Sequence, residues 1–336
     1  MATAGGLPAP AQSLFGGDIF ATRAWYDTTC QFALPEGASA CFVEIRDGPR
    51  LFAVVPMLRQ GPHVASLTTP YSCLWHPLGA ADLTQADWKA AGTQLAKWCK
   101  SSAVTRLEAL DPQAPWFAPL VAGLRAGGLV PLRFDHFGNW HTVLPAGGWP
   151  AYLATRPGAL RETIRRRGNK LRASGASFSV LRAGPGLAEA IRAYQQIYAR
   201  SWKTPEPFPL FNPAFMRACA ADGTLRLGLL TRGETPLAAQ FWVVRGGCAT
   251  VLKLAHDEQA RAEAPGTVLT AHMIETLIEQ DNISELDFGR GDDPYKADWT
   301  DTRRQRTGVL LADPWRPAGL AAIARHLVGV MRRGRK

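Results

Sequence analysis

The segment 248–299 gathers most of the side chains in this sequence that could do acid–base or anion-binding chemistry. Carboxylate, phenol and ammonium groups follow a predicted strand there, at Asp287, Asp292, Tyr295 and Lys296. A buried strand does not need such groups, so they indicate either a reactive site or a solvated turn. His256 ends the preceding strand and is an alternative base, since an unperturbed imidazole titrates near neutrality.

A helix start inside this segment could bind an anion. Pro265, Gly266 and Thr267 open a predicted helix after the strand that carries Lys253 and Leu254. Backbone N–H groups in the first turn of a helix have no partner within the helix, and the helix dipole makes that end partly positive. The pattern therefore predicts a site for a diphosphate, and an ordinary loop-to-helix turn is the alternative.

Cations are concentrated in a predicted helix over 160–172, LRETIRRRGNKLR. They are Arg161, Arg165, Arg166, Arg167, Lys170 and Arg172, with Glu162 as a counter-charge. Repulsion among them favours an anionic partner such as a cofactor phosphate or a lipid, and a solvated helix face is the alternative. No aromatic residue interrupts 158–176, so a nucleic-acid partner is disfavoured.

A basic amphipathic helix is predicted for the C-terminal segment 314–336. Apolar residues recur there at helical spacing, and the cations include Arg325 and Arg332. Such a helix either lies on an anionic membrane or docks its apolar stripe on the protein core.

The composition is that of a globular protein, with 46% hydrophobic and 20% charged residues in a chain of 336 and a net charge of +10. The six cysteines form no C-x-x-C pair, and no H-E-x-x-H motif, Walker A loop or G-x-G-x-x-G motif is present, so no metal is predicted. There is no signal-peptide pattern and no long apolar run, which predicts a cytoplasmic protein, peripheral to the inner membrane at most.

Two successive α/β patterns meet at a Pro- and Gly-rich boundary, 145–150. Each shows the order strand, strand, strand, helix, strand. The predicted elements of the first half are strands at 39–47 and 50–58, a stretch of strand and loop character at 65–79, strands at 104–110, 129–134 and 140–144, and helices at 84–100 and 115–127. Those of the second half are strands at 177–182, 224–231, 236–245, 248–256 and 283–289 and helices at 151–174, 185–201, 214–220 and 266–280.

The residues of the second half resemble those of a known family. A strand, an aspartate loop, a Pro-Gly helix start and the pattern D-F-x-x-G-D-x-x-Y-K-x-x-W are similar to the BioF2-like, or type 6, acetyltransferase domain of the GNAT superfamily, to which Fem-type transferases are related. The similarity covers roughly residues 150–310, and the first half shows only a loose version of it. It implies an α/β fold of two tandem GNAT-like halves, mixed sheets flanked by helices. The domains would be 1–146, a degenerate half, and 147–313, the catalytic half, followed by 314–336.

The resemblance also implies a reaction, the transfer of an acyl group from an acyl thioester to an amine. The donor would be acyl-CoA or acyl carrier protein, bound as a co-substrate rather than permanently. The amine would belong to a lipid, as in ceramide synthesis, or to a cell-envelope precursor, and a chain with two halves would be a monomer. Alternatives are a Fem-type transferase that uses aminoacyl-tRNA and a non-catalytic scaffold at a membrane or polysaccharide-synthesis complex.

Site roles follow from the same resemblance. Asp287 or Asp292 would hold or deprotonate the amine, and Tyr295 would protonate the departing thiolate. Lys296 would neutralise a phosphate or carboxylate, and His256 is the second candidate base. The donor would lie along Lys253, Leu254, Pro265, Gly266 and Thr267, with Arg165 as a further phosphate ligand.

Overall fold

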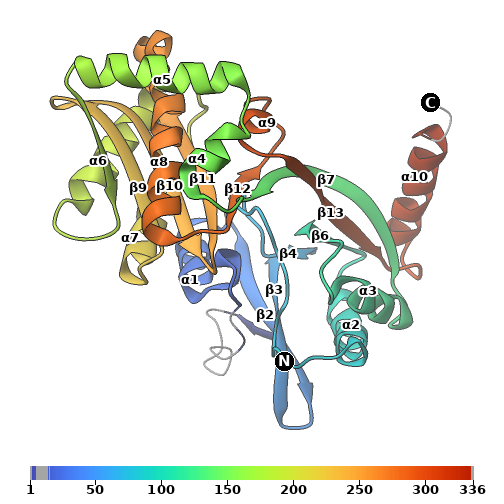
Figure 1. The fold of residues 1–336 in the computed structure, drawn as a ribbon. Coiled ribbons are helices and arrows are strands. Elements are labelled where there is room, and N and C mark those ends of the chain that lie inside the picture. The colour runs from blue at the N-terminus through green and yellow to red at the C-terminus, as the bar shows by residue number, and fades with distance from the viewer. Residues whose placement is uncertain (1, 5–13, 15, 334–336) are drawn as a thin grey trace. The chain divides into compact units, whose positions relative to one another are not determined.

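The computed structural model describes residues 2–4, 14 and 16–333 of the chain (Figure 1). The chain forms two compact units, one of residues 1–138 and 305–336 and one of residues 139–304. The division falls at Gly138 and Arg304, whereas the sequence-based division placed its boundaries at residues 146 and 313. The two boundaries in the structure lie inside strands, the first in β7 (Val130–Val143) and the second in β13 (Thr302–Ala312).

The first unit is a mixed sheet with two helices packed against each other, α2 and α3. Its strand order is β1-β2-β3-β4-β6-β13, with β5 paired to β3. The strands are β1 (Ala2–Ala4), β2 (Ala38–Asp47), β3 (Arg50–Gln60), β4 (His63–Ser66), β5 (Leu78–Gly79) and β6 (Val104–Leu110). The helices are η2 (Ile19–Ala21), α1 (Arg23–Phe32), α2 (Gln85–Cys99), α3 (Phe117–Ala126) and α10 (Pro317–Arg333).

The second unit is a mixed sheet with helices packed on it. Its strand order is β7-β12-β11-β10-β9-β8, and β11 and β12 run parallel. The strands are β8 (Ala176–Leu181), β9 (Leu225–Arg232), β10 (Thr235–Arg245), β11 (Cys248–His256) and β12 (Glu285–Arg290). The helices are α4 (Gly148–Ala154), α5 (Gly158–Ala173), α6 (Leu187–Arg200), α7 (Phe211–Ala221), η3 (Glu258–Glu263), α8 (Pro265–Asp281) and α9 (Lys296–Trp299).

The predicted recurrence of strand, strand, strand, helix, strand is present in both units. It is β2, β3, β4, α2, β6 in the first and β9, β10, β11, α8, β12 in the second. In each unit the two strands that flank the helix pair in parallel, β4 with β6 and β11 with β12. The connecting helix carries the chain back to the end of the sheet at which the strand before it began, so both strands run in the same direction. The apolar face of α8 forms a core with strand residues that include Trp242, Val251 and Phe288.

Some elements differ from the prediction. The segments 129–134 and 140–144 are one strand, β7, because the intervening Gly138-Asn139 does not turn and Asn139 is fully buried. The predicted helix 151–174 is two helices, because Pro157 lacks the N–H that would continue the first of them. Strand β13 was not predicted, since its arginine-rich first half hides the pattern of the buried residues that follow.

The C-terminal helix α10 packs on the first unit by a narrow strip. Ala322 is buried and Ile323 is half-buried against Leu132 and Ala312. The residues 334–336 of the predicted segment lie outside the described part. None of the described helices combines the length and the apolarity that a membrane crossing requires.

Candidate active site

Strands β11 and β12 pair over a short stretch in the second unit and then diverge, and the point at which they diverge is called the fork below. Their parallel pairing covers Cys248–Thr250 against Glu285–Asp287, and beyond these residues the two strands separate. On its other side β12 changes register with β7 between Asp287 and Arg290, where Gly289 takes a φ of 65°. Only glycine adopts this conformation at no steric cost, so the D-F-G sequence allows the strand to bend at the fork.

A bulge in β11 decides which of its side chains face α8. The register between β10 and β11 shifts at Phe241/Trp242, which face Lys253 and Val251 respectively and leave Leu252 as the extra residue. Val251 therefore packs in the α8 core, and after the bulge Leu254 and His256 point to that side. Lys253 points to the other face, where its Nζ lies 2.7 Å from Glu206 Oε1.

A cavity of about 500 Å³ lies between the end of β11, the start of α8 and α9. It is lined mainly by apolar and aromatic groups with a few polar ones. Its residues are Leu160, Trp202, Leu254, His256, Glu258, Arg261, Ala264, Gly266, Thr267, Thr270, Tyr295, Asp298 and Trp299. This combination of an apolar wall and convergent polar groups is typical of small-molecule sites.

The first turn of α8 faces this cavity with free backbone donors. Ala264 precedes the helix with a φ of 55°, and among the described residues no side chain caps the helix. Pro265 has no N–H, so Gly266 and Thr267 present the first ones. The buried Gln240 on β10 holds this turn in place, because its Nε2 donates to the Gly266 carbonyl (3.1 Å) and to Thr270 (2.8 Å).

The corresponding helix of the first unit has a different N-terminus. Thr84 accepts a hydrogen bond from the Asp87 N–H, and Asp87 accepts one from the Thr84 N–H, which forms a capping box at the start of α2. A carboxylate thus already occupies the positive end of α2. An anionic ligand would be repelled there, whereas the start of α8 carries no such charge.

His256 lies directly against the start of α8. Its ring packs on Trp202 with centroids 4.4 Å apart, and a Cβ on Gly266 would come within 3.1 Å of its Nδ1. Burial lowers the pKa of His256 below its usual value, and the nearby Arg261 lowers it further against the opposing effect of Glu258. The imidazole is therefore neutral at pH 7, and Gly266 gives it room.

Tyr295 reaches the same cavity from the loop after β12. Its ring meets Phe288 edge-on at 6.5 Å, and its side chain is 37% exposed. Desolvation of the hydroxyl raises the pKa of Tyr295, and the Asp293 carboxylate raises it further, so the phenol stays protonated at neutral pH. The 2%-exposed Lys296 fixes this loop, since its Nζ donates to the carbonyls of Arg290 (2.7 Å) and Gly291 (3.1 Å).

Asp287 lies at the fork and is fully engaged in hydrogen bonds. Its carboxylate accepts from the Gly289 N–H (2.7 Å), from Asn139 Nδ2 (2.6 Å) and from Arg304 (2.5 Å). Asn139 also donates to the Gly289 carbonyl (2.9 Å). Asp287 thus joins β12, β7 and Arg304 on the face of the sheet opposite α8, as its position between the α8-facing residues Leu286 and Phe288 requires.

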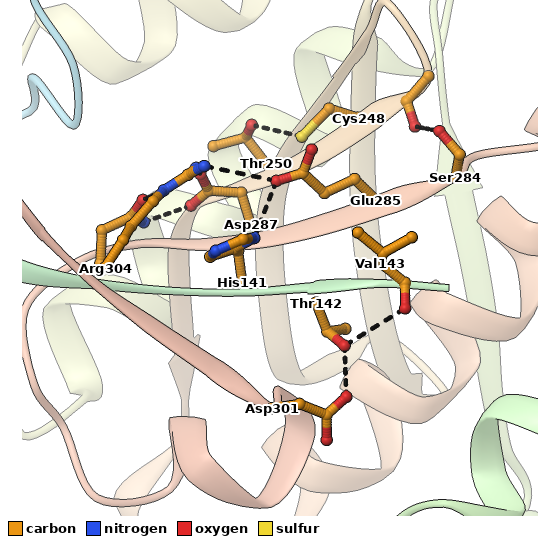
Figure 2. A network of polar contacts seen from close by, with 12 residues as sticks. His141, Thr142, Val143, Cys248, Thr250, Ser284, Glu285, Asp287, Asp301 and Arg304 are labelled. Carbon is orange, nitrogen blue, oxygen red and sulfur yellow. Dashed lines mark hydrogen bonds and ion pairs between the residues drawn. The ribbon is translucent and has the colours of Figure 1, made fainter. Parts of the chain in front are cut away.

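A histidine–carboxylate pair adjoins Asp287 on that face (Figure 2). His141 pairs with Asp287 across β7 and β12, and its Nδ1 lies 3.2 Å from Glu285 Oε1. Burial lowers the pKa of His141, and Arg304 lowers it further, while Glu285 and Asp287 oppose them. The imidazole is again neutral near pH 7, and Glu285 orients it.

Besides Asp287, Lys296 and Pro265, three more predicted site residues are absent from the lining of the α8 cavity. Lys253 faces the opposite side of the sheet, as described above. Asp292 forms an exposed pair with Arg303 (2.6 Å) and accepts from Trp140 Nε1 (3.1 Å). Arg165 lies on the exposed face of α5 and pairs with Glu162 at 2.8 Å.

The comparison with family models decides the class of the second unit. Residues 158–297 match the model of the acetyltransferase (GNAT) domain. This stretch is a GNAT domain. It spans the fork, the bulged strand, α8 and Tyr295, and the predicted family resemblance is confirmed.

Solved structures extend the similarity beyond the GNAT domain to most of the chain. The crystal structure of FemX is similar with a TM-score of 0.62 at 10% identity, over 93% of this chain and 98% of that one. The C-terminal domain of a putative lysylphosphatidylglycerol synthetase from Agrobacterium fabrum has a TM-score of 0.56 at 14% identity, over 84% and 87%. A tandem GNAT protein from the clavulanic acid biosynthesis pathway has a TM-score of 0.51 at 13% identity, over 94% and 99%. None of the curated proteins matches the chain in sequence. The predicted fold of two tandem GNAT-like halves is confirmed.

Some residues of the GNAT domain's site were missed by the sequence analysis. Arg261 lines the cavity, as does Trp299, which the motif of the sequence had included without a role, and the His141–Glu285 pair adjoins the fork. Arg261 lies four residues before Pro265, close enough to the helix start to have been a candidate. His141 and Glu285 are 144 positions apart, and only the register of β7 with β12 brings them together.

A second cavity, of about 330 Å³, lies by α6 and the proline-rich loop that follows it. Its lining includes Tyr198, Lys203, Glu206 and Asn212. Burial lowers the pKa of Lys203, and the neighbouring Lys253 ammonium lowers it further. This cavity is on the side of the sheet to which Lys253 points, and the GNAT domain therefore has hollows on both faces.

Proposed function

We propose that this chain is an N-acyltransferase that moves an acyl group from an acyl thioester to a primary amine, with the second unit holding the donor. The observation that carries the proposal is the cavity in which the uncapped start of α8, the bulged end of β11 and the protonated Tyr295 meet. The match to the GNAT domain supports the reaction class. Acyl-CoA and acyl carrier protein are the donors that suit a positive helix end, because both carry phosphate.

The donor's phosphate end belongs at α8. The N–H groups of Gly266 and Thr267 would bind phosphate oxygens, and the exposed Arg261 at the cavity rim would add a guanidinium. His256 lies against Gly266, so it adjoins the phosphate end rather than the thioester. We therefore assign it to donor binding and not to proton transfer.

The thioester belongs at the fork. There the free backbone edges of β11 and β12 can accept the pantetheine arm, and strand N–H groups can stabilise the oxyanion. The amine reaches the same carbon from the opposite face, where the His141–Glu285 pair lies. Nucleophilic attack forms the C–N bond, and the neutral imidazole of His141 takes the proton that the amine loses.

Breaking the C–S bond releases a thiolate, which needs a proton. Tyr295 is the donor of that proton in this proposal, because its hydroxyl lines the cavity and carries a proton at neutral pH. Asp287 and Lys296 act as positioning residues, since one holds the fork and the other holds the loop that presents Tyr295. The second cavity, beside Lys203, is the proposed place for the rest of the acceptor, and an amine-bearing lipid or cell-envelope precursor is the proposed acceptor class.

The first unit is proposed to hold no donor. Its equivalent helix start carries the Thr84–Asp87 capping box, which fills the anion position with a carboxylate. The duplicated fold would then use one half for chemistry and the other for support.

The test places a charge at the start of α8. Thr267→Asp puts a carboxylate in the first turn, where it favours the helix but repels a phosphate, and Thr267→Asn is the matched neutral control. Calorimetric titration with acetyl-CoA, palmitoyl-CoA and CoA should show saturable binding to the natural protein and to Thr267→Asn. We expect binding to Thr267→Asp at least about ten-fold weaker, which is roughly 1.4 kcal/mol of repulsion.

Each outcome is informative. Equal affinities of the two Thr267 variants would refute the assignment of the phosphate end to α8. If none of the three compounds binds the natural protein, while a phosphopantetheinylated carrier protein or an aminoacyl-tRNA does, the CoA donor is wrong and a carrier or Fem-type donor replaces it. If no acyl donor of any of these kinds binds, the chain is a non-catalytic module.

A further inference from the structure

Helix α10 presents an apolar stripe that the protein itself does not cover. Only one side of the helix is docked, through Ala322 and Ile323, in the part of the chain that the structure describes. On a separate side Leu320 is 55% exposed, Leu327 54% and Met331 61%. With Ala324 these residues are spaced by four, three and four positions, so they form one continuous stripe about 16 Å long.

The sequence around the stripe is strongly and uniformly cationic. The segment 314–336 contains Arg316, Arg325, Arg332, Arg333, Arg335 and Lys336 and no aspartate or glutamate. Arg325 lies about 100° around the helix from Ala324 of the stripe and donates to the Ala321 carbonyl of its own helix (3.3 Å), a contact that leaves its charge uncompensated. Trp315, in the turn two residues before the helix begins, is 86% exposed.

We propose that this face of α10 docks the protein on the surface of an anionic lipid membrane. The apolar stripe would enter the boundary between headgroups and acyl chains, and the arginines would contact the lipid phosphates. The exposed indole of Trp315 before the helix suits the same boundary, because tryptophan combines an apolar ring with an N–H donor. Figure 1 shows α10 as the last helix of the chain, next to β13.

The charge pattern favours a membrane over a second copy of the chain. Two copies of the segment 314–336 packed stripe to stripe would bring two sets of six cations together without a carboxylate from either segment, and Asp313, just before the segment, already pairs with Arg316 of its own chain (3.5 Å). An anionic lipid surface supplies the missing counter-charge over the whole length of the helix. This inference does not depend on the proposed catalytic function, because α10 and the donor cavity belong to different units.

The experiment is co-sedimentation of the full chain with lipid vesicles. Vesicles of phosphatidylcholine with about one third phosphatidylglycerol should bind the protein at low salt, and pure phosphatidylcholine vesicles should not. Arg325→Glu with Arg332→Glu should weaken binding by roughly 30-fold or more, since each basic residue near an anionic surface contributes about five-fold. Leu327→Ser with Met331→Ser should weaken it by about ten-fold or more through lost apolar burial.

A matched control separates α10 from the other basic helix. Arg166→Glu with Lys170→Glu on α5 makes the same double charge reversal at exposed positions of the second unit and should leave vesicle binding within about two-fold, as Arg166→Glu alone should. Equal loss from the α5 double variant, or unchanged binding of both α10 double variants, would overturn the proposal. The proposal would also fail if the natural protein did not bind vesicles but formed dimers at higher concentration in analytical ultracentrifugation, and if Leu327→Ser with Met331→Ser abolished those dimers.

Discussion

Replacing Asp287 by asparagine tests whether this carboxylate holds the fork together. The substitution keeps the shape and one oxygen, which can still accept the Gly289 N–H. Asn139 Nδ2 donates to this same oxygen and also keeps its acceptor, whereas the new amide group replaces the oxygen that accepts from Arg304, so that guanidinium N–H loses its acceptor and the ion pair is lost. Asp287 is buried, but the Arg304 side chain is 30% exposed and can be partly solvated, which reduces the penalty.

The magnitude follows from these contacts. Breaking a buried ion pair costs about 3–5 kcal/mol before solvation of the exposed partner is considered, and water can replace part of the acceptor that Arg304 loses. We therefore expect Asp287→Asn to lower the free energy of unfolding of the second unit by about 2–3 kcal/mol. For a unit of this size that corresponds to a fall in Tm of roughly 4–12 °C.

Asp292→Asn is the matched control. The Asp292 side chain is 47% exposed and that of its partner Arg303 is 39% exposed, so the loss of this ion pair should cost about 0–1 kcal/mol. Urea unfolding followed by near-UV circular dichroism measures both variants. If Asp292→Asn destabilises the protein as much as Asp287→Asn, or if Asp287→Asn costs under about 0.5 kcal/mol, the assignment of Asp287 to the fork is wrong.

Two further predictions concern proton transfer. Tyr295→Phe should lower kcat by roughly 100-fold, because the hydroxyl would supply the proton when the thiolate departs. The affinity for acetyl-CoA, measured by calorimetry, should change less than about two-fold. An unchanged kcat would remove Tyr295 from the mechanism. The pKa of His141 is lowered, so the acid limb of the kcat–pH profile should lie below pH 6.5, and it should disappear together with most of the rate in His141→Gln. The same shift makes His141 a source of stability that is present above pH 6.5 and is lost as the pH falls toward the lowered pKa, because the unfolded chain binds that proton more tightly. A profile that keeps the same acid limb in His141→Gln would assign the base elsewhere.

Local sequence patterns were sufficient for the elements that bind the donor. The run of apolar and β-branched residues at 248–256 and the Pro-Gly start of the next helix predicted β11 and α8 closely, and β6 was predicted at its observed bounds. His256, Gly266 and Tyr295 consequently line one cavity, as their positions near strand ends and a helix start suggested. Alternation and helix starts are short-range properties, so a single segment reveals them.

What only the tertiary structure decided depends on register and packing between distant segments. Strict alternation along β11 would place Lys253 on the same face of the sheet as Val251, but the bulge between them turns Lys253 to the other face, away from the cavity. The pairing of β7 with β12 joins His141 to Glu285 and buries Asn139, which in sequence looked like part of a turn. Docking α10 by a single side leaves Leu327 and Met331 exposed, although a helical pattern alone fits a buried stripe equally well. Sequence periodicity fixes which residues share a face, whereas the burial of that face depends on the surfaces that the rest of the chain brings to it.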